Sequence, residues 1–159
     1  MNNLEMLDEY KDKSIILELK DKRSLVLAKA LKNKNIKTTL ILLPYGITSK
    51  LDILLLACKY LDMDYKVIDI TNILDKVDEV ISKEFDSNLD SSIYRMNSIN
   101  NIKYTTLKGI SDLNNFLIFS SDETKSFNDA IYPLLDIKDE RIEELYINLN
   151  IPNVFKNEM

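Results

Sequence analysis

Apolar runs of strand length alternate with longer segments in which apolar residues recur at helical spacing, and this alternation constrains the fold more than any other feature of the chain. The predicted strands cover residues 14–19, 36–43, 64–70 and 116–119. The predicted helices cover residues 4–11, a segment that begins near Ser24, 49–61, 71–85, 93–112 and 139–150. Parallel neighbouring strands need crossover connections of about a dozen residues or more, and helices supply them. The sequence therefore predicts an α/β fold, a Rossmann-like three-layer sandwich with a mostly parallel sheet, in one domain over residues 1–159.

Polar residues at several helix starts are predicted to cap the first turn, because a side-chain oxygen there accepts an otherwise unpaired backbone N–H. We expect Ser24 to cap the first long helix, and Thr71 or Asn72 to cap the helix over 71–85. Residues 120–122 are expected to cap a helix that follows them. The inward face of the 71–85 helix is predicted to consist of Ile73, Leu74, Val77, Val80 and Ile81.

The rare residue types exclude several classes of chemistry. The chain has no His, so it has no imidazole base and no His-ligated metal, and its single Cys excludes an internal disulfide or a Cys-rich zinc site. The two glycines, Gly46 and Gly109, lie far apart, so no loop can use paired glycines to bring its N–H groups against a phosphate. Cys58 is predicted to be a buried apolar residue, since a nucleophilic thiol needs a cationic, partly exposed setting.

The charge balance argues against nucleic acid as a partner. Acidic residues outnumber basic ones 26 to 21, which gives a net charge of -5. Glu5, Asp8 and Glu9 interrupt the N-terminal segment where a secretory signal needs basic and then apolar residues, and no apolar run approaches the length of a membrane span. We therefore expect a soluble, cytoplasmic protein that does not contact membranes.

Ligands of parallel α/β folds bind at the carboxyl ends of the strands, which fall here at residues 20–24, 44–49, 70–72 and 120–125. Lys20, Lys22 and Arg23 could bind phosphate through charge instead of a glycine-rich loop. The alternative is that their long side chains fill or shield a vacated pocket.

Two further groups at these strand ends allow a ligand interpretation and a structural one. Asp69, Asp122 and Glu123 are candidate magnesium ligands, although surface or capping roles are commoner for such carboxylates. Tyr45, next to Pro44, could pack on an adenine ring or could close the core at the end of a strand.

Several motifs follow one another in a definite order along the chain: Leu43–Asp52 with its Pro-Tyr loop, Tyr65–Ile70, Asn97–Tyr104, Asn115–Ser121 and Ile151–Pro152. In this order they resemble the motifs of ammonia-dependent NAD synthetases. The resemblance covers nearly the whole chain in order, although that family is usually about half again longer. It implies the adenine nucleotide alpha-hydrolase-like (N-type ATP pyrophosphatase) fold, in which ATP adenylates a carboxylate, pyrophosphate leaves and ammonia attacks.

The chain departs from that family at its reactive positions. The family's Ser-Gly-Gly-x-Asp-Ser pyrophosphate loop falls on residues 19–24, where only Ser24 survives in type. The paired arginines of the family fall on Asn101 and Lys103, and its Gly-Thr pair falls on residues 120 and 121. The family's metal-site acid falls on Ser126. These departures indicate a scaffold that has lost the family's reaction.

The sequence thus predicts a shortened, degenerate NAD synthetase-like protein without amide-ligase activity, which serves as a nucleotide-binding or protein-interaction module. Its candidate nucleotide-binding residues are Lys20, Lys22, Arg23, Ser24, Pro44, Tyr45 and Ser121, with no catalytic residue and with Asp122 and Glu123 as metal candidates. The alternative is an active ligase that uses ATP and magnesium to adenylate a carboxylate. A third possibility is a structural partner with an empty crevice.

The consecutive apolar residues 53–56 cover more than one face of their helix, so one face needs a cover other than the sheet. A neighbouring helix of the same chain is one candidate. NAD synthetases, which the chain resembles, are tight homodimers. We therefore expect a homodimer, or a heteromer with a complete NAD synthetase.

Overall fold

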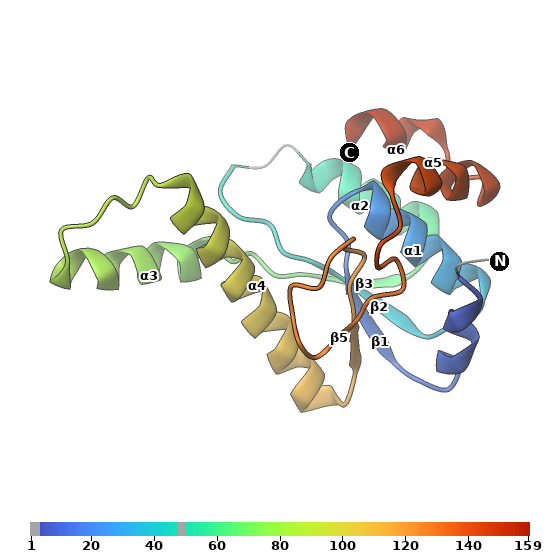
Figure 1. The fold of residues 1–159 in the computed structure, drawn as a ribbon, viewed down its shortest axis with the longest axis horizontal. Helices are drawn as coiled ribbons and strands as arrows, with labels where there is room; N and C mark the ends of the chain where they lie inside the picture. The colour runs from blue at the N-terminus through green and yellow to red at the C-terminus, as the bar shows by residue number, and fades with distance from the viewer. Residues whose placement is uncertain (1–3, 48–49) are drawn as a thin grey trace.

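Within residues 4–47 and 50–159, which the computed structural model describes, the strands form a five-stranded parallel sheet of order β3-β2-β1-β4-β5 (Figure 1). The strands are β1 (Ile15–Glu18), β2 (Thr38–Leu42), β3 (Asp64–Val67), β4 (Leu117–Phe119) and β5 (Ala130–Ile131). The chain runs outward from β1 to β3 and then returns to pair β4 on the other side of β1. The order of strands therefore reverses between β1 and β4.

Helices cover both faces of the sheet (Figure 1). On one face lie α1 (Lys22–Asn33), α2 (Leu51–Leu61), α5 (Asp139–Asn148), α6 (Asn153–Glu158) and the short 3₁₀ helix η1 (Glu5–Tyr10). On the other face lie the start of α3 (Thr71–Glu84) and the C-terminal part of α4 (Ser92–Asn114). Each face has its own hydrophobic core, so the predicted Rossmann-like three-layer α/β fold is confirmed.

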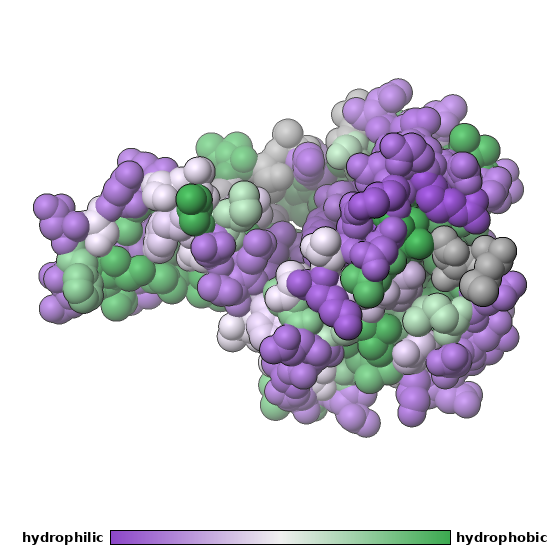
Figure 2. Space-filling model, in the orientation of Figure 1, coloured by the Kyte–Doolittle hydropathy of each residue, from purple (hydrophilic) through white to green (hydrophobic). Residues whose placement is uncertain are grey.

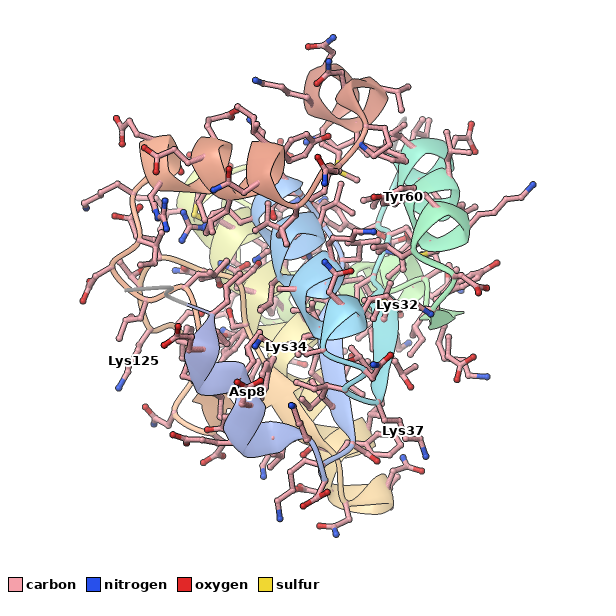
Figure 3. The ribbon with its side chains drawn as sticks, turned by 90° about the vertical axis from the view of Figure 1, so that its right-hand side faces the viewer. Asp8, Lys32, Lys34, Lys37, Tyr60 and Lys125 are labelled. Carbon is pink, nitrogen blue, oxygen red and sulfur yellow. The ribbon has the colours of Figure 1, made fainter. Side chains whose placement is uncertain are left out.

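Helix α1 is the central helix of its layer. Its stripe of leucine, valine and alanine side chains is buried against β1 and β2. Just past its C-terminal end, Lys34 points toward Asp8 of η1, and its Nζ donates to Asp8 Oδ1 at 2.8 Å (Figure 3). The position of α1 fixes the turn between β1 and α1, which the site described below uses.

Two predicted caps are wrong. The N-cap of α1 is Asp21, whose side chain accepts the Ser24 N–H, so Ser24 lies inside the helix. Neither Thr71 nor Asn72 caps α3; instead Asp69 Oδ1 accepts the Thr71 N–H at 2.8 Å. In both cases an aspartate two or three residues before the predicted cap accepts the N–H of that residue, and a carboxylate accepts a stronger hydrogen bond than a hydroxyl does.

The predicted strand over 64–70 is shorter and more exposed than its alternating pattern indicates. Strand β3 lies at the edge of the sheet, and all four of its residues are exposed. The two-residue strand β5 and helix α6 were not predicted. Helix α6 contacts α2, and the ring of Phe155 on α6 lies 5.4 Å from the ring of Tyr60 on α2.

Helices α3 and α4 form an arm that projects away from the sheet (Figure 1). Within the arm, Tyr94 and Arg95 of α4 both donate to the carboxylate of Asp78 on α3. Ile73 and Val80, which are predicted to face inward, are 46% and 54% exposed because the arm extends beyond the sheet. Hydrophobic side chains gather along the arm in Figure 2. Among the described helices, none has the length and apolar character needed to cross a membrane.

Candidate functional site

A pocket of about 520 Å³ lies at the carboxyl ends of β1 and β2, and we call it the β1–β2 pocket. Its apolar wall is formed by Leu19, Leu42, Leu43, Pro44, Ile47, Leu51 and Leu54, with the Tyr45 ring beside them. Its charged lining consists of Glu18, Lys20, Asp21, Lys50 and Lys103. A cavity of this size that combines an apolar wall with polar groups is typical of a small-molecule site.

Two charged residues of this pocket neutralise each other. Lys103 of α4 reaches over the end of β1, and its Nζ donates to Glu18 Oε2 at 2.6 Å. Both side chains are largely buried, at 15% and 12% exposed. The Lys103 ammonium also lies 5.5 Å from the centre of the Tyr45 ring. Neither Glu18 nor Lys103 is predicted from the sequence as a pocket residue, although Lys103 falls on one of the paired arginines of the family that the chain resembles. The signal for Glu18 is a lone charge in an otherwise apolar strand run.

Lys20 and Asp122 join the carboxyl ends of β1 and β4, where the strand order reverses. Lys20 Nζ donates to Asp122 Oδ1 at 2.7 Å. Burial alone lowers the pKa of Lys20, but its hydrogen bond to Asp122 and the charge of Glu18 more than offset this effect, so the pKa is raised. Behind the pair only about 10 Å³ of space remains. Ligands of open α/β sheets bind at such a reversal point, and in this chain the pair fills it.

The turn between β1 and α1 is closed by its own side chains. The Ser24 hydroxyl accepts the N–H groups of Lys20 and Asp21, each at 2.9 Å, and donates to the Asp21 carbonyl at 2.8 Å. The Ser24 N–H donates to the Asp21 carboxylate at 2.9 Å, which completes a capping box. A carboxylate therefore lies at the positive end of α1, where an anionic ligand would otherwise bind.

The other two basic residues of the turn hold the C-terminal segment instead of lining the pocket. Lys22 forms an ion pair with Glu143 of α5. The Arg23 guanidinium donates to three backbone carbonyls, those of Ser121, Leu134 and Ile137, at 2.9, 3.0 and 2.9 Å. The structure thus brings Lys20, Pro44 and Tyr45 to the pocket, with Ser24 buried just behind the turn, and places Lys22 and Arg23 outside it.

Ser121 is buried in the segment that follows β4. Its carbonyl accepts from Arg23, while its hydroxyl oxygen has no hydrogen-bond partner among the described residues. The helix that residues 120–122 are predicted to cap does not form, because the chain continues as a loop into β5. The Ser120 hydroxyl accepts the Asp122 N–H at 3.2 Å within that loop.

The candidate magnesium ligands do not form a metal site. Asp122 is paired with Lys20, and Glu123 is paired with Lys138, whose hydrogen bond holds the pKa of Glu123 below its ordinary value. Hydrogen bonds from Thr71 likewise hold the pKa of Asp69 below its ordinary value. In the described part of the chain no three Asp, Glu, Cys or His residues form a group that could hold a metal ion. The residues present do not fit the magnesium ion that ATP chemistry requires.

A second pocket of about 440 Å³ lies between α4 and the loop before β5. Asn97, Asn100, Asn101 and Asn128 contribute to its lining, and the Tyr104 and Phe127 rings stack at 4.5 Å beside them. Its side chains are uncharged. The ion pair of Lys20 and Asp122 lies between this pocket and the β1–β2 pocket. The small space beside the pair shares Lys20 with the β1–β2 pocket and Phe127 with this one.

Cys58 lies on the buried face of α2, as its apolar setting predicts. Burial raises the pKa of its thiol to about 11. A thiol with so high a pKa is almost wholly protonated near neutral pH and is a weak nucleophile.

The order of the strands and the pocket at their carboxyl ends define the class of the protein as a Rossmann-like α/β domain. Solved structures with the same fold show which Rossmann-like domains it is similar to. NMN synthetase from Francisella tularensis matches with a TM-score of 0.80 and 18% identity, over 96% of this chain and 71% of that one. An NH3-dependent NAD synthetase from Campylobacter jejuni matches with a TM-score of 0.78 and 23% identity, over 99% and 72%. A glutamine-dependent NAD+ synthetase from Acinetobacter baumannii, solved with ADP, matches with a TM-score of 0.76 and 18% identity, over 93% and 31%.

The chain therefore has the fold of the NAD synthetases and is shorter than these structures. By sequence, no family model and no curated protein matches it.

Proposed function

We propose that this chain is a NAD synthetase-like protein that forms no amide bonds and serves as a module that binds an adenine-containing ligand. The observation that carries the proposal is the capping box of Asp21 and Ser24. An enzyme that adenylates a carboxylate must hold the departing pyrophosphate with free N–H groups and cations. In this turn the N–H groups of Lys20 and Asp21 are already bonded, and the Asp21 carboxylate repels a phosphate.

The cations and acids around the turn support the same proposal. Lys20 is paired with Asp122, while Lys22 and Arg23 are engaged with the C-terminal segment. Asp122 and Glu123 each pair with a lysine, so neither is available to place magnesium on a triphosphate.

The ligand-binding part of the proposal rests on the β1–β2 pocket. Its apolar wall and the Tyr45 ring suit a planar heterocycle, and its charged end suits the hydroxyl groups of a sugar. The fold neighbour from Acinetobacter baumannii was solved with ADP, which supports an adenine-containing ligand.

An assay of pyrophosphate release tests the loss of activity. The purified chain is incubated with ATP, magnesium, nicotinic acid adenine dinucleotide and ammonium, beside the NH3-dependent NAD synthetase of Campylobacter jejuni as the positive control. We expect no pyrophosphate, AMP or NAD above the no-protein background. Equimolar formation of the three products would overturn the proposal and establish the alternative, an active ligase.

We also propose that the chain associates through the arm of α3 and α4, with a second copy or with a complete NAD synthetase. Val80, Phe85, Ile93 and Met96 are exposed on this arm, and exposed apolar side chains grouped together are typical of protein interfaces. Sedimentation at micromolar concentration should give a particle larger than the 18.5 kDa chain. Met96→Asp should return it to the mass of one chain, whereas Leu113→Asp, at an exposed position near the other end of α4, should not. The association would be contradicted if the wild-type protein sediments with the mass of one chain and this mass does not change when NAD synthetase is added.

A further inference from the structure

We infer that the β1–β2 pocket selects a nucleoside without phosphate groups over the corresponding nucleotides. This inference rests on the proposed function, since it specifies the class of adenine-containing ligand that the same pocket takes. It inverts the preference expected of a site built for ATP, and it follows from how the charges of the pocket are paired.

The first step concerns the cations that a phosphate would need. Lys103 is bonded to Glu18 at 2.6 Å, and Lys20 is bonded to Asp122 at 2.7 Å. Lys50, the third lysine of the lining, also has an interaction of its own. A phosphate that enters the pocket must compete with a carboxylate for Lys103 or Lys20, and a carboxylate that loses its partner in a partly buried place is destabilised.

The second step concerns the negative charges that a phosphate would meet. Glu18 and Asp21 both line the pocket at the end of β1. The N–H groups of Lys20 and Asp21 donate to the Ser24 hydroxyl, and the N–H of Ser24 donates to Asp21, so these three groups are not oriented toward a ligand. Because Glu18 is offset by Lys103, the repulsion comes from the Asp21 carboxylate; like charges repel in a half-buried site, so each added phosphate group weakens binding.

The third step concerns what the pocket offers a nucleoside. Leu43, Pro44, Leu51 and Leu54 form an apolar wall beside the exposed Tyr45 ring, which suits the two faces of a purine. Glu18 ends the strand at the charged side of the pocket. A carboxylate oxygen there can accept hydrogen bonds from the hydroxyl groups of a ribose. It can do so while it holds Lys103, because two carboxylate oxygens accept several hydrogen bonds.

Calorimetric titration of the full chain with adenosine, AMP and ATP, without divalent metal, tests the inference. We expect adenosine to bind at least tenfold more tightly than AMP, and ATP to bind more weakly than AMP. AMP or ATP binding as tightly as adenosine would overturn the selectivity and leave the proposed binding function intact. If none of the three binds at millimolar concentration, both proposals fail and a structural partner with an empty crevice remains.

Variants of the two acids test the cause of the selectivity. Glu18→Gln removes one acid and releases Lys103 from its ion pair, so the preference for adenosine over AMP should fall about tenfold. Asp21→Asn should also reduce the preference, and it keeps the helix cap, because asparagine caps as well as aspartate. It therefore tests the charge even if Glu18→Gln folds poorly, which circular dichroism would reveal.

The matched control is Asp112→Asn, which removes the same charge from the exposed surface of α4, outside the pocket. We expect it to leave the ratio of the two affinities unchanged. If the control and both pocket variants give the wild-type ratio, the paired charges do not set the selectivity and the inference is wrong.

Discussion

Lys20 Nζ lies 2.7 Å from Asp122 Oδ1, and this one ion pair connects the carboxyl ends of β1 and β4. Ligands of open parallel sheets enter between strands at such a point of reversal. Here Lys20 and Asp122 border a space of only about 10 Å³, which shares Lys20 with the β1–β2 pocket and Phe127 with the asparagine-lined pocket.

Replacing Asp122 should show how much this pair stabilises the fold. Asp122→Asn removes the charge but keeps the size of the side chain, so we expect the free energy of unfolding to fall by about 1 kcal/mol at pH 7, because the pair is only partly buried. Denaturant unfolding of wild type and variant measures the difference. The matching change at an exposed pair, Asp112→Asn, should have a smaller effect.

The pH dependence of that difference follows from the raised pKa of Lys20. A lysine whose folded-state pKa is raised contributes stability below its unfolded value, and the contribution is lost as the pH rises through the folded value. The gap between wild type and Asp122→Asn should therefore stay constant from neutral pH to pH 9 or so and shrink above the ordinary lysine value of 10.5. A gap that widens at high pH would contradict this explanation.

Arg23 should matter for stability more than its position in the turn between β1 and α1 indicates. Its guanidinium donates to the carbonyls of Ser121, Leu134 and Ile137, and lysine cannot reproduce this planar set of bonds. We expect Arg23→Lys to lower the free energy of unfolding by about 2 kcal/mol. Arg141→Lys, on the exposed side of α5, is the control and should change it by less than about 0.5 kcal/mol.

Cys58 should be unreactive in the folded protein. Its thiol is buried with a pKa of about 11, so roughly one molecule in a thousand carries the thiolate at pH 8. A disulfide reagent that releases a coloured product when a thiol attacks it measures this reactivity. It should label Cys58 slowly in the native protein and at once in the denatured protein. Complete labelling of the native protein within the mixing time would show that the thiol is accessible.

The two glycines should respond to alanine in opposite directions. Gly109 lies inside α4 with no atom near the place of a Cβ, so Gly109→Ala should raise the free energy of unfolding by about 1 kcal/mol. Gly46 has a φ of +62°, which L-residues adopt reluctantly, so Gly46→Ala should lower it by about 1 kcal/mol. Denaturant midpoints of the two variants decide the matter, and a shift of the same sign in both would contradict the backbone argument.

The architecture could be predicted from sequence because the spacing of apolar residues differs between strands and helices. Strands β1, β2 and β4 fall inside the predicted runs, since each is buried on both faces. Strand β5 has only two residues, too few for any period to appear. The exposure of the Ile73 and Val80 side chains could not be predicted, because the apolar spacing within α3 does not show that the helix extends beyond the sheet.

The sequence predicts where the site lies in the fold, but it does not predict which of its residues contact one another. The predicted strand ends include Lys20, Pro44 and Tyr45, and the structure brings these three residues to the β1–β2 pocket. The partners that decide the charge of the pocket are remote in sequence: Lys103 is 85 residues from Glu18, and Asp122 is 102 residues from Lys20. Local patterns carry no information about such pairs, so the internal neutralisation of the pocket needed the three-dimensional structure.

The capping box at the start of α1 also affects how the fold depends on its surroundings. A helix whose positive end awaits an external anion is completed only when that anion is bound, so its stability varies with the supply of the anion. In this chain the Asp21 carboxylate is covalently part of the same turn. The first crossover of the sheet therefore needs no external anion to complete its helix. Its stability should not vary with the concentration of phosphate or ATP in the surrounding solution.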